Sequence, residues 1–198
     1  MRLLFVFSFL FLITFLKSQN VDSLANITSE LKESEIRIYK SRGITNSGHI
    51  FRIYKDDKTW KAELIQWFLP KEISKDEFEW IKPKLTVLKS EKSLEELFVN
   101  IKARNIGFLP KEEYFQYKKE QSQVIYDEEE KDWVFETKKS IWVLDGTYYL
   151  VKYQSGKQQN EFDYSNPESY LKHYPEIDEL NYFVDILKYI RNEFDIEF

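Results

Sequence analysis

Polar and apolar residues alternate along three neighbouring segments of the chain. Residues 35–40 (EIRIYK) and 49–55 (HIFRIYK) place isoleucine or phenylalanine on one side and arginine and tyrosine on the other. Residues 59–68 continue the alternation, and segments 41–48 and 56–58 between the three are rich in turn-forming residues. Strands joined by such short connections predict an antiparallel meander with one face against a hydrophobic core.

Apolar residues at helical spacing predict a short helix over 21–33, a second over 93–104 and a third over 175–194. Ser93 and Glu96 form a capping box at the start of the second helix. The third helix has Pro175 in its first turn, a position that favours proline. Its apolar stripe consists of Ile177, Leu180, Val184, Leu187, Ile190 and Phe194.

The remaining segments are less regular. Residues 70–83 are bracketed by two prolines and predict a helical turn or an irregular crossover, and residues 110–119 are weakly helical. A short strand is expected over 85–88. Residues 124–126 and 133–136 are expected to pair across an acidic turn.

Two hairpins are expected in the C-terminal third. The stronger signal joins 141–144 to 147–153 through Asp145-Gly146, a pair that favours the positive φ angles of a type I′ turn. A second turn at 155–157 leads to a strand over 160–164.

Strands and helices therefore occur in groups and not in strict alternation. This arrangement predicts an α+β fold, with an antiparallel sheet of about six to eight strands and helices packed on one face. The C-terminal amphipathic helix over 175–194 is expected to dock on that sheet.

The N-terminus has the layout of a secretory signal peptide. Arg2 precedes an apolar run over 3–16, and polar residues follow at Lys17-Ser18. A helix of that run spans roughly 21 Å, less than the ~30 Å of a bilayer core. We therefore expect cleavage after Ser18, a single domain over 19–198 and export to the periplasm or the extracellular space. Retention as an anchor is the alternative, because Leu16 occupies a position where a small residue is usual.

Composition excludes several kinds of chemistry. The chain has no cysteine and two histidines, so disulfides, thiol catalysis and multi-histidine metal sites are excluded. We expect no metal and no cofactor. Loss of Arg2 and Lys17 with the signal leaves 27 of the 29 basic residues against 34 acidic ones, a net charge of −7. Such a chain repels nucleic acid, and no integral membrane span is expected after signal cleavage.

The best candidate binding surface comes from the two strands that share the sequence Arg-Ile-Tyr-Lys. If these strands pair, Arg37, Tyr39, Arg52 and Tyr54 project from the same face, away from the core. Guanidinium groups beside phenols can bind a carboxylate, a phosphate or a sugar ring. The alternative is cross-strand packing of arginine and tyrosine over an exposed sheet face, and the pattern favours this alternative.

Other features permit chemistry without defining a site. The acidic run over 127–132 lacks the ligand spacing and the central glycine of a calcium-binding EF-hand loop, and a solvated hairpin tip explains it better. Sixteen Phe, thirteen Tyr and five Trp could supply stacking platforms for sugars. The codons of an AT-rich genome also account for this composition, as they do for the many lysines. No serine lies in a G-x-S-x-G setting.

Several short motifs resemble small exported proteins of unknown function found in Bacteroidota. They are Lys17-Ser18-Gln19-Asn20, Leu144-Asp145-Gly146-Thr147-Tyr148-Tyr149, Tyr164-Ser165-Asn166-Pro167-Glu168 and Tyr174-Pro175-Glu176. The resemblance covers the signal and the C-terminal third, and it carries no functional residues. The sequence favours an exported, soluble, non-enzymatic protein that binds an unknown partner protein or an envelope component. The alternative is a carboxylate-dependent hydrolase that acts on envelope glycan or peptide.

Overall fold

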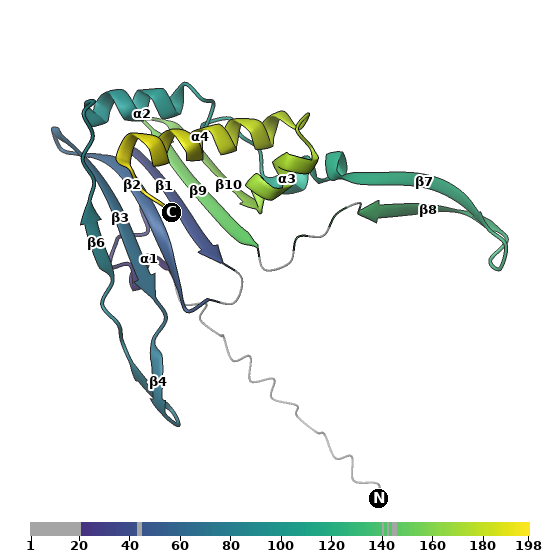
Figure 1. Cartoon of the computed structure of the whole chain (residues 1–198), viewed down its shortest axis with the longest axis horizontal. Coiled ribbons are helices and arrows are strands. Elements are labelled where there is room, and N and C mark those ends of the chain that lie inside the picture. The colour runs from purple at the N-terminus through teal and green to yellow at the C-terminus, as the bar shows by residue number, and fades with distance from the viewer. Residues whose placement is uncertain (1–20, 43–44, 140, 142, 144–145) are drawn as a thin grey trace, which may run out of the picture.

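The computed structural model describes residues 21–198 except 43–44, 140, 142 and 144–145, and its fold is α+β (Figure 1). At its centre is a six-stranded antiparallel sheet with the strand order β10-β9-β1-β2-β3-β6. Its strands are β1 (Ser34–Arg42), β2 (Ser47–Asp56), β3 (Thr59–Phe68), β6 (Lys84–Val87), β9 (Thr147–Ser155) and β10 (Gln158–Ser165). The predicted fold class, with its antiparallel sheet and C-terminal helix, is confirmed.

The helices lie mainly on one face of this sheet (Figure 1). They are α2 (Leu94–Lys102), α3 (Pro167–His173), α4 (Asp178–Phe194) and the 3₁₀ helices η1 (Glu112–Tyr114) and η2 (Gln116–Lys119). The short helix α1 (Val21–Leu24) packs against the opposite face. Ser93 caps α2 as predicted, because its hydroxyl accepts a hydrogen bond from the backbone N–H of Glu96 at 3.1 Å.

The meander β1-β2-β3 forms as the alternation predicts. Ile36 lies opposite Ile53 and Ile38 opposite Phe51, and all four side chains are fully buried under the helices. A one-residue shift in register would expose this set and bury its polar neighbours, so the pattern specifies the pairing.

Strand β9 pairs with β1 on one side and with β10 on the other. The second predicted turn, around Gly156 with φ of +59°, connects β9 to β10. The stronger predicted hairpin, between residues 141–144 and 147–153, does not form in the residues that the structure describes. Ile141 and Val143 lie in no strand, because the neighbours of β9 are β1 and β10, while Trp142, Leu144 and Asp145 lie outside the described residues.

Helix α4 docks on β9 and β10 through the predicted stripe. All six residues of the stripe are buried, from Ile177 just before the helix to Phe194 at its end. Phe183, also buried, contacts Tyr149, Phe162 and Tyr164 edge to face at 5.0–5.6 Å between ring centres. Burial of this aromatic cluster holds the helix to the sheet.

Two further expectations are wrong. The helix predicted over 21–33 ends at Leu24, because Asn26 adopts a left-handed conformation with φ of 56°. Residues 70–83 contain a hairpin of β4 (Lys71–Ser74) and β5 (Glu77–Glu79), whose turn includes Asp76 at φ of 67°.

A second hairpin forms as predicted from β7 (Glu120–Asp127) and β8 (Asp132–Lys139). This hairpin, which we call the arm, is a separate two-stranded sheet that projects away from the rest of the molecule (Figure 1). The weakly helical segment 110–119 before it becomes η1 and η2, and η1 lies beside β10.

Candidate functional site

The structure brings the four predicted binding residues together. Arg37 lies opposite Arg52 in the β1–β2 ladder, and Tyr39 and Tyr54 lie on the same face, away from α2 and α4. All four are buried, however, and Arg37 is fully so. The N-terminal segment that contains α1 contacts Arg37 and Tyr39.

All three nitrogens of the Arg37 guanidinium are engaged within the chain. Nε donates to the Glu35 carboxylate, Nη1 donates to the carbonyl of Thr28 at 2.6 Å and Nη2 donates to the carbonyl of Glu30 at 2.8 Å. Burial opposes the charge, but the hydrogen bond and the negative charge of Glu35 outweigh it and raise the pKa of Arg37. This guanidinium therefore fastens the N-terminal segment to the sheet.

Arg52 shares the same carboxylate. Its Nε donates to Glu35 Oε1 at 2.9 Å, and its Nη1 lies 3.4 Å from Glu63 Oε2. The guanidinium lies 4.2 Å from the ring centre of Tyr54, whose hydroxyl donates to Glu63 Oε1 at 2.9 Å. Burial and the Glu63 carboxylate raise the pKa of Tyr54 to about 12.

Tyr39 completes the cluster from the other side. Its hydroxyl donates to Asp22 Oδ1 at 2.6 Å, and burial followed by this hydrogen bond raises the pKa of Tyr39. Asp22 belongs to α1 and lies 3.7 Å from Arg37 and 3.8 Å from Lys152. The four predicted residues thus belong to a buried ionic cluster with Asp22, Glu35 and Glu63, which the sequence reasoning missed. Alternation places Glu35 on the face of Arg37, and this was the available signal.

A surface cavity of about 530 Å³ lies near the end of the sheet. Its basic lining residues are Lys40, His49 and Arg191. Arg191 donates to the Tyr149 hydroxyl at 2.9 Å and to Glu168 at 2.8 Å, so it connects α4, β9 and α3. Burial and Lys40 lower the pKa of His49, which makes this cavity less cationic at neutral pH.

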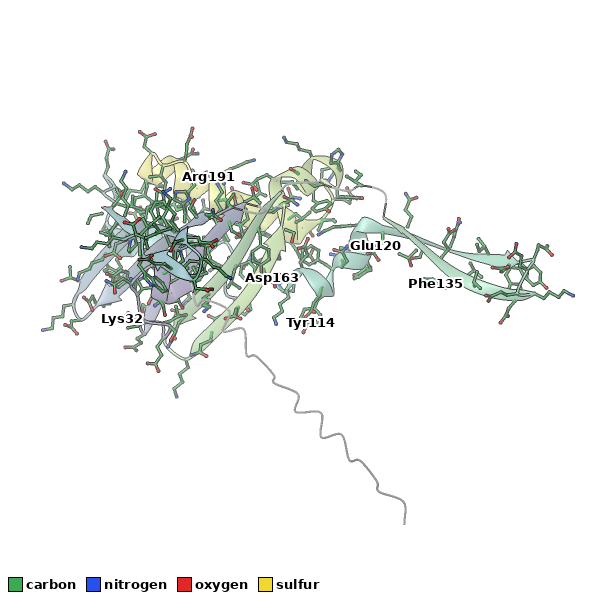
Figure 2. All side chains as sticks on the ribbon, turned by 90° about the horizontal axis from the view of Figure 1, so that it is seen from below. Lys32, Tyr114, Glu120, Phe135, Asp163 and Arg191 are labelled. Carbon is green, nitrogen blue, oxygen red and sulfur yellow. The ribbon has the colours of Figure 1, made fainter. Side chains whose placement is uncertain are left out.

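One face of the arm is apolar and open to solvent. The register places Val124 opposite Phe135 and Tyr126 opposite Trp133, and all four side chains lie on the same face. Phe135 is 72 % exposed, Trp133 68 % and Val124 63 %. Figure 2 shows Phe135 on the projecting arm, well away from the side chains that crowd the central sheet. We call these four residues the arm face.

The tip of the arm is acidic. Residues 127–132 contain five acidic side chains and one lysine, and they form the predicted hairpin turn. Asp127 Oδ1 accepts hydrogen bonds from the backbone N–H groups of Glu129 and Glu130 at 2.8 and 3.1 Å. The carboxylate of Asp127 thereby stabilises the turn.

A second apolar surface lies at and near the outer edge strand β6. Leu85 and Val87 face away from α2 and are 53 % and 65 % exposed, while Trp80 (67 %) and Ile81 precede the strand. Trp80, Ile81 and Pro83 line a shallow cavity with Leu24 of the N-terminal segment. We call Trp80, Ile81, Leu85 and Val87 the edge surface.

Comparison of the chain with models of protein families, with curated proteins and with solved structures gives no match. None of the helices in the described part of the chain is long and apolar enough to cross a membrane. Within the described ranges, no group of three or more acidic or histidine side chains is placed to hold a metal ion.

Proposed function

We propose that the protein is an exported, non-enzymatic binding protein that engages a partner or an envelope component through its arm. The observation that carries this proposal is the exposed aromatic face of a hairpin that projects from the molecule. Contiguous exposed apolar surface is costly in water, and it marks interaction sites in most folded proteins. Aromatic residues also dominate the energetics of protein interfaces.

The buried ionic cluster supports the non-enzymatic part of this proposal. Among the described residues, the buried carboxylates are Asp22 and Glu35, and both lie beside the guanidinium of Arg37. Carboxylates held in this way take part in structural ion pairs. A hydrolase would instead need one carboxylic acid kept protonated in a cleft and a second carboxylate facing it.

Export is the other component of the proposal. The n-region, apolar run and polar boundary of residues 1–20 support secretion, and a secreted protein of this kind meets its partners in the periplasm or outside the cell. The absence of cysteine is compatible with that compartment, because a domain of about 180 residues can be stable through its core alone.

The test compares two variants in cells that produce the protein. Phe135→Ser together with Trp133→Ser removes the two most exposed aromatic side chains of the arm face, whereas Phe108→Ser removes an aromatic side chain that is 78 % exposed elsewhere. In an envelope extract sized by gel filtration, the wild type and the Phe108 variant should elute in a complex larger than one chain. The arm variant should elute as a single chain. The proposal is contradicted if the wild type elutes as a single chain. It is also contradicted if the arm variant elutes in the complex as the wild type does.

A further inference from the structure

The arm face and the edge surface are both apolar and both lack a cover within the described part of the chain. They also differ in charge. Lys82, Lys84 and Lys89 are exposed beside the edge surface, and residues 80–90 contain no acidic residue. This segment therefore has a local charge of +3 in a mature chain whose net charge is −7.

The acidic tip of the arm has the opposite charge, −4 over residues 127–132. Within the described ranges, neither the three lysines nor the side chains of Glu128, Glu129 and Glu130 take part in an ion pair. The arm and the edge surface are therefore complementary. Each has exposed aromatic or branched side chains beside unpaired charges, and the charges of the two surfaces have opposite signs. Such complementarity steers association and selects its register.

One chain cannot bring its own arm to its own edge surface. The arm follows η2 on the β10 side of the sheet, and β6 is the opposite edge strand. Five strand spacings of about 4.8 Å separate these edges, roughly 24 Å, and the arm points away from β6 (Figure 1). The outer side of β6 carries no paired strand among the described residues, so its backbone groups are open to a further strand.

We infer that the arm of one copy docks on the edge surface of a second copy of this chain, with the acidic tip against Lys82, Lys84 and Lys89. This contact is head to tail, so repetition gives a ring or a filament instead of a closed two-fold dimer. The inference rests on the proposed function, because it names a second copy as a partner of the arm. If the arms of two copies instead paired with each other in parallel, their tips, each of charge −4, would meet. Coulomb repulsion opposes that contact.

The experiment is analytical ultracentrifugation of the purified mature chain over a concentration series. A contact made by a single hairpin is small, so we expect self-association in the micromolar range. Added salt should weaken it about tenfold between low and physiological ionic strength, because exposed opposite charges are screened. Association that salt strengthens, or a wild type that stays monomeric at several hundred micromolar, would overturn the inference.

Two variants and their mixture test the head-to-tail geometry. Trp133→Thr with Phe135→Thr disables the arm face, and Leu85→Thr with Val87→Thr disables the edge surface, in each case with a residue that suits a strand. Each variant alone should be monomeric, because one of the two required surfaces is missing. Their equimolar mixture should form a dimer that grows no further, since a single intact arm meets a single intact edge.

The outcomes separate this inference from the proposed function. If the edge variant still self-associates as the wild type does, or if the mixture stays monomeric, the head-to-tail contact is wrong. If the purified wild type is monomeric while the arm is still required for the complex in the envelope extract, the proposed function stands and the second copy is not the partner. Circular dichroism of each variant confirms that it is folded.

Discussion

Glu35 is the residue on which the buried cluster depends. It is fully buried and accepts hydrogen bonds from Arg37 Nε, from Arg52 Nε and from the backbone N–H of Lys32. A buried carboxylate is stable only when such partners replace the lost water. The two arginines are therefore explained by the carboxylate between them.

The first prediction concerns Arg37→Ala. The substitution leaves the carbonyls of Thr28 and Glu30 without their donor and removes one of the two cations beside Glu35. Urea unfolding should show a loss of about 3 kcal/mol, as for other broken buried pairs. Lys61→Ala breaks an exposed pair with Asp56 and should cost less than about 1 kcal/mol. Equal effects of the two substitutions would show that the cluster is not structural.

The second prediction concerns alkaline pH. The pKa of Tyr54 is raised to about 12 from an ordinary value of 10.0, so the folded state favours the neutral phenol. The stabilisation is fully present below pH 10 and is lost as the pH rises towards 12. The free energy of unfolding, measured from about pH 9 to above pH 11, should fall over this window. Tyr54→Phe should reduce the fall, and an unchanged slope in that variant would refute the assignment.

At the residue scale, alternation correctly predicted that the two arginines and two tyrosines share a face. It did not predict that this face is buried, because the N-terminal segment covers it through the carbonyls of Thr28 and Glu30. Every residue has a backbone carbonyl, so the sequence does not indicate which carbonyls accept hydrogen bonds from Arg37. Only the three-dimensional path of the segment from residue 21 to 33 reveals this contact.

At the scale of elements, α4 is essential to the core. Its stripe packs on β9 and β10, and Phe194 reaches Phe51 of β2 at 5.6 Å between ring centres. A helix of this length is marginal in isolation, so its stability comes from docking. The helix and the sheet therefore stabilise each other.

The third prediction is that Leu187→Asp costs several kcal/mol, because it places an unpaired charge in a fully buried contact. Tyr182→Asp introduces the same side chain on the exposed side of the helix and should have a small effect. Thermal unfolding of the two variants gives the comparison. A chain that ends at Asn166 should lose cooperative unfolding, and an unchanged midpoint in that truncation would contradict the docking of α4.

Local patterns predicted the elements whose partners are adjacent in sequence. The meander, α2, the arm and the β9–β10 hairpin all form, because each depends on alternation, caps or a short turn. The pairing of β9 with β1 joins segments more than 100 residues apart, and no local pattern specifies it. The hairpin of β4 and β5 was missed because its residues are mostly charged and all exposed, so they show no apolar alternation.

At the scale of the whole molecule, two apolar surfaces extend from a well-packed core. The ionic cluster is buried and the aromatic arm face is exposed. In most proteins charged side chains are exposed and aromatic side chains are largely buried. An exposed hairpin with an apolar face is an aggregation hazard unless it has a defined partner. The proposed binding function accounts for this arrangement.

The fourth prediction concerns export. Intact mass spectrometry of the protein from its native cells should give a chain that begins at or near Gln19, because the layout of residues 1–20 predicts a cleaved signal peptide. The full-length chain in the cytosol would contradict export and, with it, the proposed site of action.

The fifth prediction tests the central claim, that the arm is the binding element. A photo-crosslinking phenylalanine analogue replaces Phe135 in one version of the protein and Phe108 in another, since both side chains are highly exposed. After irradiation of intact cells, the analogue at position 135 should give a discrete crosslinked product, and the analogue at position 108 should not. If the two positions crosslink alike, or if position 135 gives no product, the arm is an exposed hairpin without a partner and is not the binding element.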